Sequence, residues 1–401
     1  MPNNPLRSQF PFFGNSNNIY LDSAASSHKP QVVVDSIVDF YTKEYASNHG
    51  IHSLASDLNN RIEECRESIA ELINVYSPSE IVFTSGATES LNLLASTIKV
   101  LKGKKKILVS VSEHHSNILP WQELAHRQGL EIEYFGLEAS GKIDLVDLKS
   151  KLNIEVAILA ITHCSNVLGI INDIQGICEL ASLYKIITVV DATQSIVHTD
   201  VDVRDLGCDF LVFSGHKIYG PTGIGVLYGP KKQLELLNNY KVGGEMVELV
   251  TMNKNYYKEI PYRLEAGTIN LDGIIGLGTA IQWFRANKEQ AWKIERELSQ
   301  YCYTELQKIS GIKFLVDYSG FSSGFHSTIF SFTITGINTF DLAQYLNLQN
   351  ISVRSGQQCA GILHEYLGID NSLRVSLGCY NTREDIDKLI LALQVGIEKL
   401  G

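Results

Sequence analysis

Seven short apolar segments alternate with helical patterns between residues 81 and 228, and this alternation constrains the fold more than any other feature. The segments are Ile81–Phe83, Ile107–Val111, Ile132–Phe135, Val156–Ile161, Ile186–Val190, Phe210–Phe213 and Gly225–Tyr228. Strands that are apolar at nearly every position are typical of parallel sheets covered on both faces. We therefore predict an α/β fold whose large domain has a mainly parallel, seven-stranded sheet, with functional groups at the carboxyl ends of the strands.

The pattern changes after about residue 280, where we predict a smaller α+β domain. A long charged helix is expected from about Ile281 through Leu306, and a final amphipathic helix has Thr382 as its N-cap. Strand-like segments lie between these helices at Ile312–Val316, Thr328–Ile334 and Ile351–Arg354. We assign residues 17–280 to the large domain and 281–401 to the small C-terminal domain, with residues 1–16 packed on the small domain.

Charge and composition exclude several classes of protein. The 401 residues include 34 Lys and Arg against 44 Asp and Glu, and the net charge of −10 argues against nucleic-acid binding. No apolar stretch reaches the roughly 20 residues of a membrane helix, and the N-terminus does not resemble a signal peptide. The seven scattered cysteines form no Cys-x-x-Cys pair. We therefore expect a cytoplasmic protein with free thiols, no metal and no membrane or nucleic-acid partner.

The polar segment Ser85–Ser90 follows the predicted strand Ile81–Phe83 and begins a helix. Gly86 permits a tight turn, and the first amides of the helix face outward at the positive end of its dipole. Such a helix start binds anions, most naturally a phosphate. A helix cap without a ligand is the alternative interpretation.

Two further strand ends carry an acid and an amine. Asp191 ends an apolar strand, where a carboxylate requires a cation or several hydrogen-bond donors. A protonated heterocyclic nitrogen could be that partner, and a helix N-cap is the alternative interpretation. Lys217 follows another strand in company with Ser214 and His216, and a desolvated lysine becomes a nucleophile. A solvent-exposed loop lysine is the alternative. A phosphate loop, an acid and an amine in this order match the requirements of pyridoxal 5′-phosphate (PLP).

Further motifs across the chain carry a family resemblance. They are Tyr20–Ala25, Glu113–Asn117, Thr162–Asn166, Ser214–Lys217, Glu265–Thr268 and Arg354–Ala360, with Arg374 placed fifteen residues after Cys359. On these motifs the chain resembles the class V, fold-type I PLP-dependent transferases. It is most similar to the Suf-type (group II) cysteine desulfurases and the related cysteine sulfinate desulfinases. The short segment around Cys359 fits group II, because group I enzymes carry this cysteine on a longer loop.

The resemblance implies roles for the residues around PLP. Lys217 would bind PLP as a Schiff base, and Asp191 would keep the pyridine nitrogen protonated. Gln194 would bond the phenolic oxygen, and His114 would stack on the ring. The alternative is that His114, one of the chain's eleven histidines, lies in a loop and binds no ligand.

The resemblance also implies a phosphate site shared between subunits. Ala87, Thr88, Ser214 and His216 would hold the phosphate. Thr268 would reach it from the neighbouring subunit, so the protein is expected to be a homodimer.

The substrate site follows from the same resemblance. Arg374 would clamp the substrate carboxylate by a bidentate pair, and Asn166 would contact both substrate and cofactor. Arg354 and His52 would line the same pocket. A surface ion pair is the alternative for Arg374.

Cys359 would be the nucleophile. Most cytosolic cysteines are buried structural residues, but Arg354–Gly356 predicts a turn, and Gln357 and Gln358 predict an exposed loop. An accessible thiol near cationic groups ionises and attacks sulfur. Many Suf-type relatives have one or two histidines where this chain has the two glutamines.

The resemblance therefore predicts a cysteine desulfurase that converts L-cysteine to L-alanine through a persulfide on Cys359. The sulfur would pass to a SufE-like acceptor protein and supply iron–sulfur cluster assembly or a related biosynthesis. The alternatives are a selenocysteine lyase or cysteine sulfinate desulfinase and, more distantly, a class V aminotransferase.

Overall fold

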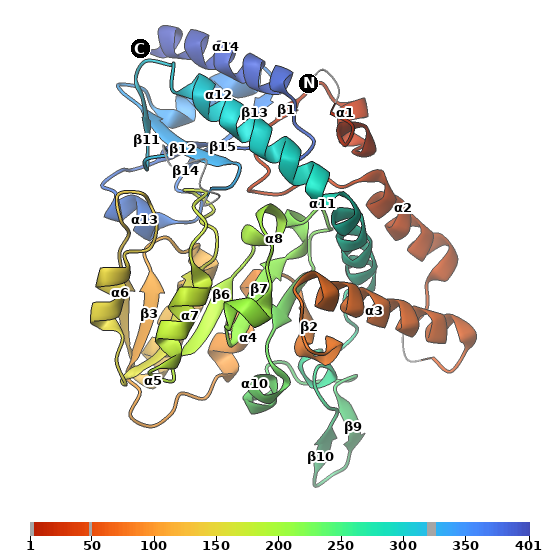
Figure 1. The fold of residues 1–401 in the computed structure, drawn as a ribbon. Helices are drawn as coiled ribbons and strands as arrows, with labels where there is room; N and C mark the ends of the chain where they lie inside the picture. Colours follow the sequence, from red (N-terminus) through yellow and green to blue (C-terminus); the bar gives the residue numbers. More distant parts are fainter. Residues whose placement is uncertain (1–3, 48–49, 319–325) are drawn as a thin grey trace.

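The computed structural model describes residues 4–47, 50–318 and 326–401. Its largest element is a seven-stranded sheet in the order β2-β8-β7-β6-β5-β3-β4 (Figure 1). In that order the strands are β2 (Ile81–Thr84), β8 (Gly225–Tyr228), β7 (Phe210–Ser214), β6 (Ile187–Asp191), β5 (Val156–Thr162), β3 (Lys106–Ser110) and β4 (Glu131–Phe135). Only β8 runs antiparallel to its neighbours, so the predicted mainly parallel, seven-stranded sheet is confirmed.

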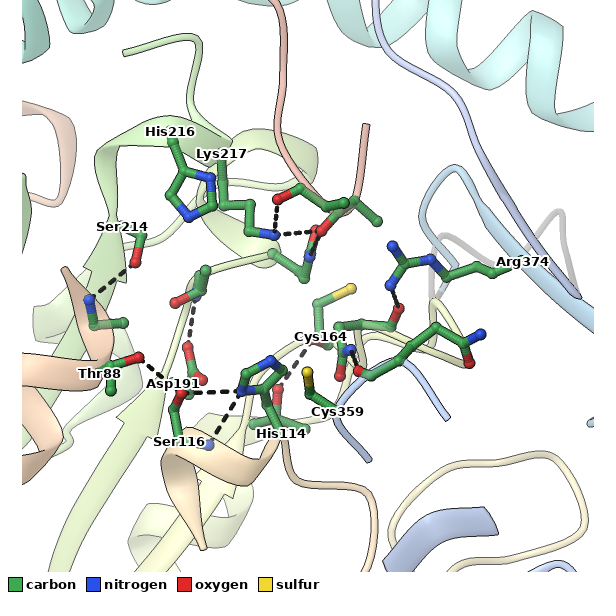
Figure 2. Close-up of a pocket in the computed structure, with 18 of the residues that line it drawn as sticks. Thr88, His114, Ser116, Cys164, Asp191, Ser214, His216, Lys217, Cys359 and Arg374 are labelled. Carbon is green, nitrogen blue, oxygen red and sulfur yellow. Dashed lines mark hydrogen bonds between the residues drawn. The ribbon is translucent and has the colours of Figure 1, made fainter. Parts of the chain in front are cut away.

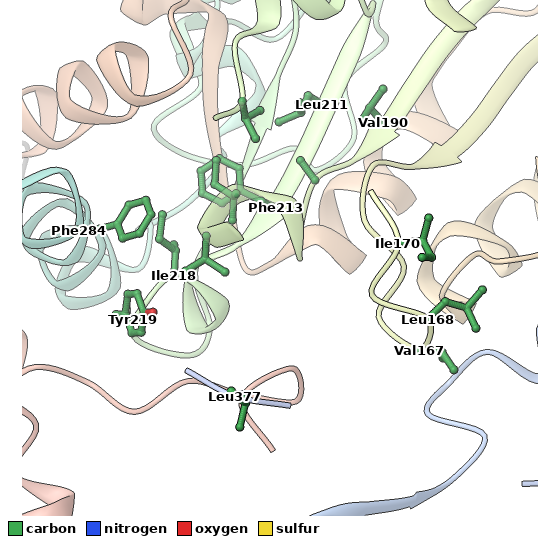
Figure 3. Packing of buried hydrophobic residues seen from close by; sticks show 14 of the residues in the cluster. Val167, Leu168, Ile170, Val190, Leu211, Phe213, Ile218, Tyr219, Phe284 and Leu377 are labelled. Carbon is green, nitrogen blue, oxygen red and sulfur yellow. The ribbon is translucent and has the colours of Figure 1, made fainter. Parts of the chain in front are cut away.

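Helices bury both faces of this sheet. Because side chains alternate along a strand, Leu108 of β3 joins one hydrophobic cluster while Ile107 and Val109 join the other. The helices α4 (Ala87–Thr97) and α5 (Leu119–Gln128) contribute to the cluster that contains Ile107. Figure 3 shows part of the opposite cluster, where strand residues pack against side chains from helices and loops. This layering leaves the strand ends as the place where polar side chains meet.

A smaller antiparallel sheet lies against the carboxyl edge of the large one. It has the order β11-β12-β15-β14, formed by β11 (Ile312–Phe314), β12 (Ile329–Ile334), β15 (Ser372–Ser376) and β14 (Arg354–Gly356). Strand β15 was not predicted, because Ser372, Arg374 and Ser376 make every second position polar. A strand with one polar face is nevertheless stable here, since Leu373 and Val375 face the core.

The remaining elements of the C-terminal part are helices and one short parallel pair. They are α12 (Thr339–Leu348), α13 (Gly361–Tyr366), α14 (Arg383–Leu400), and β1 (Ile19–Tyr20) paired with β13 (Ile351–Ser352). Thr382 caps α14 as predicted, in a reciprocal capping box with Asp385. The N-terminal segment contacts this region, since Arg7 pairs with Asp385 at 2.8 Å.

The long charged helix begins earlier than predicted. Helix α11 spans Leu271–Leu306, so it starts ten residues before Ile281. Three glycines, at 273, 276 and 278, weaken the helical pattern there. They fit because α11 approaches its neighbours closely: a Cβ on Gly276 would meet Pro221 at 2.9 Å. The boundary between residues 280 and 281 therefore falls inside a helix, and the division into two domains stays a prediction.

Within the described ranges, no helix is both long and apolar enough to cross a membrane.

Candidate active site

A cavity of about 320 Å³ opens at the carboxyl edge of the large sheet, between that sheet and the small one (Figure 2). Most residues predicted for the site line it: Ala87, Thr88, His114, Asn166, Asp191, Gln194, Ser214, His216, Lys217, Arg354, Cys359 and Arg374. They come from separate strand ends of the large sheet and from β14, β15 and the turn after β14. The fold thus gathers residues that lie up to 287 positions apart, from Ala87 to Arg374.

One end of the cavity is an anion cradle. Gly86 has φ +150°, which L side chains rarely adopt, and α4 begins at the next residue. The Ala87 amide donates to Ser214 Oγ at 2.9 Å, and Thr88 Oγ1 lies 2.8 Å from Ser116 Oγ. Two hydroxyl groups and the positive helix end fit the oxygens of a phosphate.

His216 borders the same cradle. Burial lowers its pKa to about 4, with smaller contributions from the neighbouring lysines Lys217 and Lys29. The imidazole is therefore neutral at pH 7. Its Nδ1 lies 3.3 Å from Ser26 Oγ, which fixes the ring orientation.

Asp191 and Gln194 lie at the end of β6, and both are buried. The Thr193 amide donates to Asp191 Oδ1 at 2.9 Å, and Gln194 Nε2 donates to the Ala24 carbonyl at 2.8 Å. A carboxylate held in this way at the cavity floor fits a protonated ring nitrogen. The predicted alternative, a carboxylate serving only as an N-cap, does not account for its place in the cavity wall.

Lys217 is the buried amine of the site. Burial lowers its pKa to about 7, and the positive charge of Arg374 contributes in the same direction. Its Nζ donates to the carbonyls of Ala24 and Ala25, at 2.7 Å for Ala25. The exposed loop lysine, kept as the alternative, is excluded. An amine whose pKa lies near neutrality suits both carbonyl chemistry and proton transfer.

His114 faces the cavity from the other side, as Figure 2 shows. Its Nδ1 accepts a hydrogen bond from the Ser116 amide at 3.1 Å, so the proton of the neutral ring sits on Nε2. Burial lowers the pKa of His114, although the negative charge of Asp191 acts against this effect. A neutral, oriented ring is suited to stacking on a heterocycle.

Arg374 reaches the cavity from β15 and is only 2% exposed, so the alternative of a surface ion pair is excluded. Its Nη1 donates to the Asn166 carbonyl at 2.8 Å and its Nη2 to Asp22 Oδ1 at 3.0 Å. Arg354 donates to the same carboxylate, with Nη2 2.7 Å from Asp22 Oδ2. Asp22 therefore fixes two cationic side chains at the cavity. Sequence reasoning placed Asp22 in a motif but gave it no role.

Cys359 is the accessible thiol of the chain, because the other six cysteines are buried. Burial raises the pKa of the Cys164 thiol, which also lines the cavity, to about 12. The Cys359 carbonyl accepts from the His115 amide at 2.7 Å, at the start of the short helix η4 (His115–Asn117). The Cys359 thiol is thus held at the cavity rather than on a long free loop.

The turn that carries Cys359 is strained. Gln358 and Cys359 have φ +46° and +57°, a conformation that costs a non-glycine residue about 1–3 kcal/mol. Asn166 Nδ2 donates to the Gln358 carbonyl at 2.8 Å and helps to maintain the turn. The prediction that both glutamines are exposed is wrong for Gln358. Its side chain is buried, because both amide atoms bond to Ser372.

Two predicted site residues lie elsewhere in this chain. His52 is exposed and caps the helix α3 (Ser53–Leu72), with Nδ1 accepting from the Ala55 amide at 3.2 Å. Thr268 lines a separate pocket with Tyr240 and Lys241. The roles of His52 at the substrate and of Thr268 at a partner's phosphate stay predictions.

Ser116 and Glu113 lie in the predicted motif Glu113–Asn117, but no role was predicted for either residue. Buried Glu113 accepts from the Thr162 amide and from Asn117 Nδ2, both at 2.7 Å, and so connects two loops of the site. Among the described residues, no cluster of three or more His, Cys, Asp or Glu could hold a metal ion.

Comparisons with known proteins agree with this geometry. Residues 19–389 match the family described as Aminotransferase class-V. Cysteine desulfurase from Pectobacterium carotovorum subsp. carotovorum (strain PC1) is 37% identical over 398 residues, covering 97% of this chain and 96% of that protein. Cysteine desulfurase from Wigglesworthia glossinidia brevipalpis is 37% identical over 402 residues, covering 98% and 97%.

Solved structures give the same result. The cysteine desulfurase CsdA from Escherichia coli, with an S-sulfonic acid, has a TM-score of 0.89 and 34% identity, covering 99% of this chain and 98% of that one. The apo structure of cysteine desulfurase from Thermococcus onnurineus NA1 has a TM-score of 0.93 and 33% identity, covering 98% of each. The chain therefore belongs to the class V aminotransferase family and, within it, to the group II cysteine desulfurases.

Proposed function

We propose that the protein is a PLP-dependent cysteine desulfurase that converts L-cysteine to L-alanine and takes the sulfur as a persulfide on Cys359. The observation that carries the proposal is one cavity that holds both the buried amine of Lys217 and the accessible thiol of Cys359. An aminotransferase needs the amine but has no use for the thiol.

The residues around the cavity fit PLP. The start of α4, Thr88, Ser214 and His216 would hold its phosphate, Asp191 its ring nitrogen, and Lys217 its aldehyde carbon. When bound, PLP supplies an electron sink for the bonds at the substrate α-carbon.

Lys217 acts on the proton of the substrate α-carbon. Because burial lowers its pKa to about 7, the amine can accept this proton and later return it within one cycle at neutral pH. The carbonyls of Ala24 and Ala25, which accept hydrogen bonds from Nζ, stabilise the protonated form.

The two arginines bind the substrate carboxylate. Nη1 and Nη2 of Arg374 each carry a second hydrogen besides those given to Asn166 and Asp22, and Nε has no hydrogen-bond partner within the described residues, so the guanidinium keeps donors for a carboxylate. Asp22 keeps the guanidinium groups of Arg354 and Arg374 side by side despite their like charges. This arrangement orients the substrate thiol toward Cys359.

The sulfur transfer balances without an external oxidant. The Cys359 thiolate attacks the substrate sulfur, a sulfur–sulfur bond forms, and the bond from sulfur to Cβ breaks with its electron pair left on carbon. The sulfur is oxidised while Cβ is reduced. Protons taken from Cys359 and from the α-carbon end on Cβ and Cα of L-alanine, and the substrate thiol proton stays on the persulfide.

We further propose a cytoplasmic homodimer that passes the sulfur to a SufE-like acceptor protein for iron–sulfur cluster or related biosynthesis. The turn around Cys359 supports a protein acceptor, since its backbone is anchored by His115 and Asn166 and cannot carry the persulfide far.

Mass spectrometry tests the proposed function. After incubation with L-cysteine, the peptide that contains Cys359 is expected to be heavier by one sulfur atom, and L-alanine is expected in equal amount. Alanine without any sulfur on this peptide would contradict the persulfide step. Rates with selenocysteine and cysteine sulfinate then rank the desulfurase against the lyase and desulfinase alternatives.

A further inference from the structure

The strained turn at Cys359 is held through a buried side chain. Gln358 is 8% exposed, and its Nε2 donates to the Ser372 carbonyl at 3.1 Å. Its Oε1 lies 3.0 Å from the Ser372 hydroxyl. Both bonds fix Gln358 to β15, two positions before Arg374 on the same strand. The residue before the reactive thiol is therefore anchored to the strand that binds the substrate.

The chain of contacts continues to His364 on α13. His364 and Ser372 are each 0% exposed, and His364 Nε2 lies 3.1 Å from Ser372 Oγ. At the other side of the ring, Nδ1 lies 2.9 Å from the Ala360 carbonyl. Ala360 directly follows Cys359, so the network Gln358–Ser372–His364 connects the residues on both sides of the thiol.

The hydrogens in this network can be counted. The Ala360 oxygen only accepts, so Nδ1 must carry a hydrogen, and a neutral His364 then presents a lone pair on Nε2. Ser372 has one hydroxyl hydrogen, which both Nε2 and Gln358 Oε1 require. Turning the Gln358 amide over would place its oxygen against the Ser372 carbonyl. With a neutral imidazole, one buried contact therefore has no hydrogen.

A second proton on His364 removes the conflict. Nε2 then donates to Ser372 Oγ, whose own hydrogen goes to Gln358 Oε1, and every contact becomes a hydrogen bond. We propose that His364 is a proton-dependent positioning residue, which in its doubly protonated form completes the Gln358–Ser372–His364 network and fixes the turn that presents the Cys359 thiol for sulfur transfer. The positioning role in sulfur transfer rests on the proposed function, whereas the coupling of the turn to His364 does not.

No neighbouring titratable or charged group among the described residues forms an ion pair with the His364 ring. Glu365 on the same helix and Asp370 before β15 are exposed. His115 Nε2 accepts from the Gly361 amide, and Arg374 is paired with Asp22. Burial lowers the pKa of His364, and its bond to the Ala360 carbonyl acts in the opposite direction. Protonation is therefore expected below the ordinary histidine value of about 6.5.

Hydrogen exchange tests the coupling without relying on catalysis. In the full-length protein, the Ala360 amide bonds to the Gln357 carbonyl, an acceptor that does not titrate, so its exchange reports on the turn. After correction for intrinsic rates, we expect protection to increase as the pH falls from about 7.5 to about 5, by up to roughly fivefold once His364 is doubly protonated, the effect of one net hydrogen bond.

Two substitutions at His364 form a matched pair. Gln at this position can keep a permanent donor near Nε2, so His364→Gln is expected to remove the pH dependence while retaining protection. His364→Leu has no donor and is expected to lose protection at both pH values. Ser372→Ala, which changes little volume, should also lose it. Equal exchange in the wild type and all three variants at both pH values would overturn the proposal.

A second readout connects the network with the thiol step. The ratio of alanine formation from L-cysteine to that from cysteine sulfinate isolates the step that uses Cys359. At the acid end of the same pH range, where the wild type holds the second proton, we expect His364→Leu to lower this ratio roughly fivefold and His364→Gln to retain it. An unchanged ratio in His364→Leu would overturn the positioning role. Absence of any alanine from L-cysteine in the wild type would instead contradict the proposed function. The exchange experiment would still decide whether the turn is coupled to His364.

Discussion

The carboxylate of Asp22 lies 3.0 Å from Nη2 of Arg374, although the two residues are 352 positions apart in the chain. The pairing of backbones brings them together, because Asp22 follows β1 and forms a bridge with Ser376 at the end of β15. Arg374 is 2% exposed, so Asp22 compensates a buried charge as well as orienting it.

Asp22→Ala is expected to raise the KM for L-cysteine more than it lowers kcat. Without the carboxylate, Arg354 and Arg374 repel each other and lose their shared orientation. The free energy of unfolding should also fall by about 3 kcal/mol, since a buried guanidinium is left without its partner. Steady-state alanine formation and urea denaturation measure the two effects. Asp35→Ala, at an exposed position of the helix α2 (Gln31–Asp39), is the control, and equal KM values in both variants would count against the role of Asp22.

Lys217 should set the pH dependence of PLP capture by the apoprotein. The neutral amine reacts, and burial lowers the pKa of Lys217 to about 7. The rate constant is therefore expected to rise with pH up to about 7 and to level off above it, as followed by absorbance. An ordinary lysine would continue to gain rate up to about pH 10.4, and that behaviour would refute the assignment. Borohydride should fix PLP onto Lys217 alone, and Lys217→Ala should give no such adduct.

Cys359→Ala should separate the thiol from the rest of the site. The variant is expected to bind PLP and L-cysteine as before, because neither Lys217 nor Arg374 is altered. Alanine formation from L-cysteine should fall by several orders of magnitude, as for other lost nucleophiles, while activity on cysteine sulfinate largely survives. In Cys164→Ser, the sulfur should still appear on the peptide containing Cys359. Undiminished alanine release from L-cysteine by Cys359→Ala would favour a lyase.

Thr268→Ala should weaken PLP retention. Thr268 lies outside the cavity of its own chain, so an effect on the cofactor requires a second subunit. The measurement is the PLP content after dialysis, together with the mass in solution. Thr304→Ala is the control, because among residues 4–47, 50–318 and 326–401 its hydroxyl bonds only to the Gln300 carbonyl and side chain on the same helix. A monomer that keeps PLP tightly would disprove the shared site.

Glu265→Ala should destabilise the fold by about 3–5 kcal/mol. Glu265 forms two hydrogen bonds with Arg66, at 2.8 and 3.0 Å, and both side chains are buried. Its Oε1 also accepts from the Phe83 amide at 2.7 Å. Denaturation with urea measures the loss. A matched change at Glu384, an exposed residue of α14 whose ion pair is screened by solvent, should cost far less, and a similar loss in both variants would contradict the argument.

Local patterns were sufficient to predict the large sheet and the residues at its strand ends. Its strands are mostly apolar over consecutive positions. Asp191 ends one of them, and Lys217 lies three positions after the end of another. The cap of α14 was predictable for the same reason, because a capping box involves residues three positions apart. Physical information within a few residues of the chain was enough for each of these features.

The features that could not be predicted depend on contacts between distant segments. Asp22 acquires its role only when β1 and β15 meet. Gln358 was predicted to be an exposed polar loop residue, but it is buried because Ser372 forms hydrogen bonds with both of its amide atoms. The first ten residues of α11 contain Gly276 and Gly278, which become favourable only where Pro221 and Cys65 of neighbouring segments approach the helix closely. In each case the partner lies on another element.

The length of α11 has a thermodynamic consequence. At 1.5 Å per residue its 36 residues extend about 54 Å, and it contacts α2, α3 and α14. One hydrophobic cluster accordingly contains residues of both sheets, such as Phe213 and Phe332. Neither sheet can lose its packing without exposing apolar surface of the other, so we expect calorimetry to record a single cooperative unfolding transition. A fragment that starts at residue 281 would begin in the middle of a helix and should remain unfolded by itself.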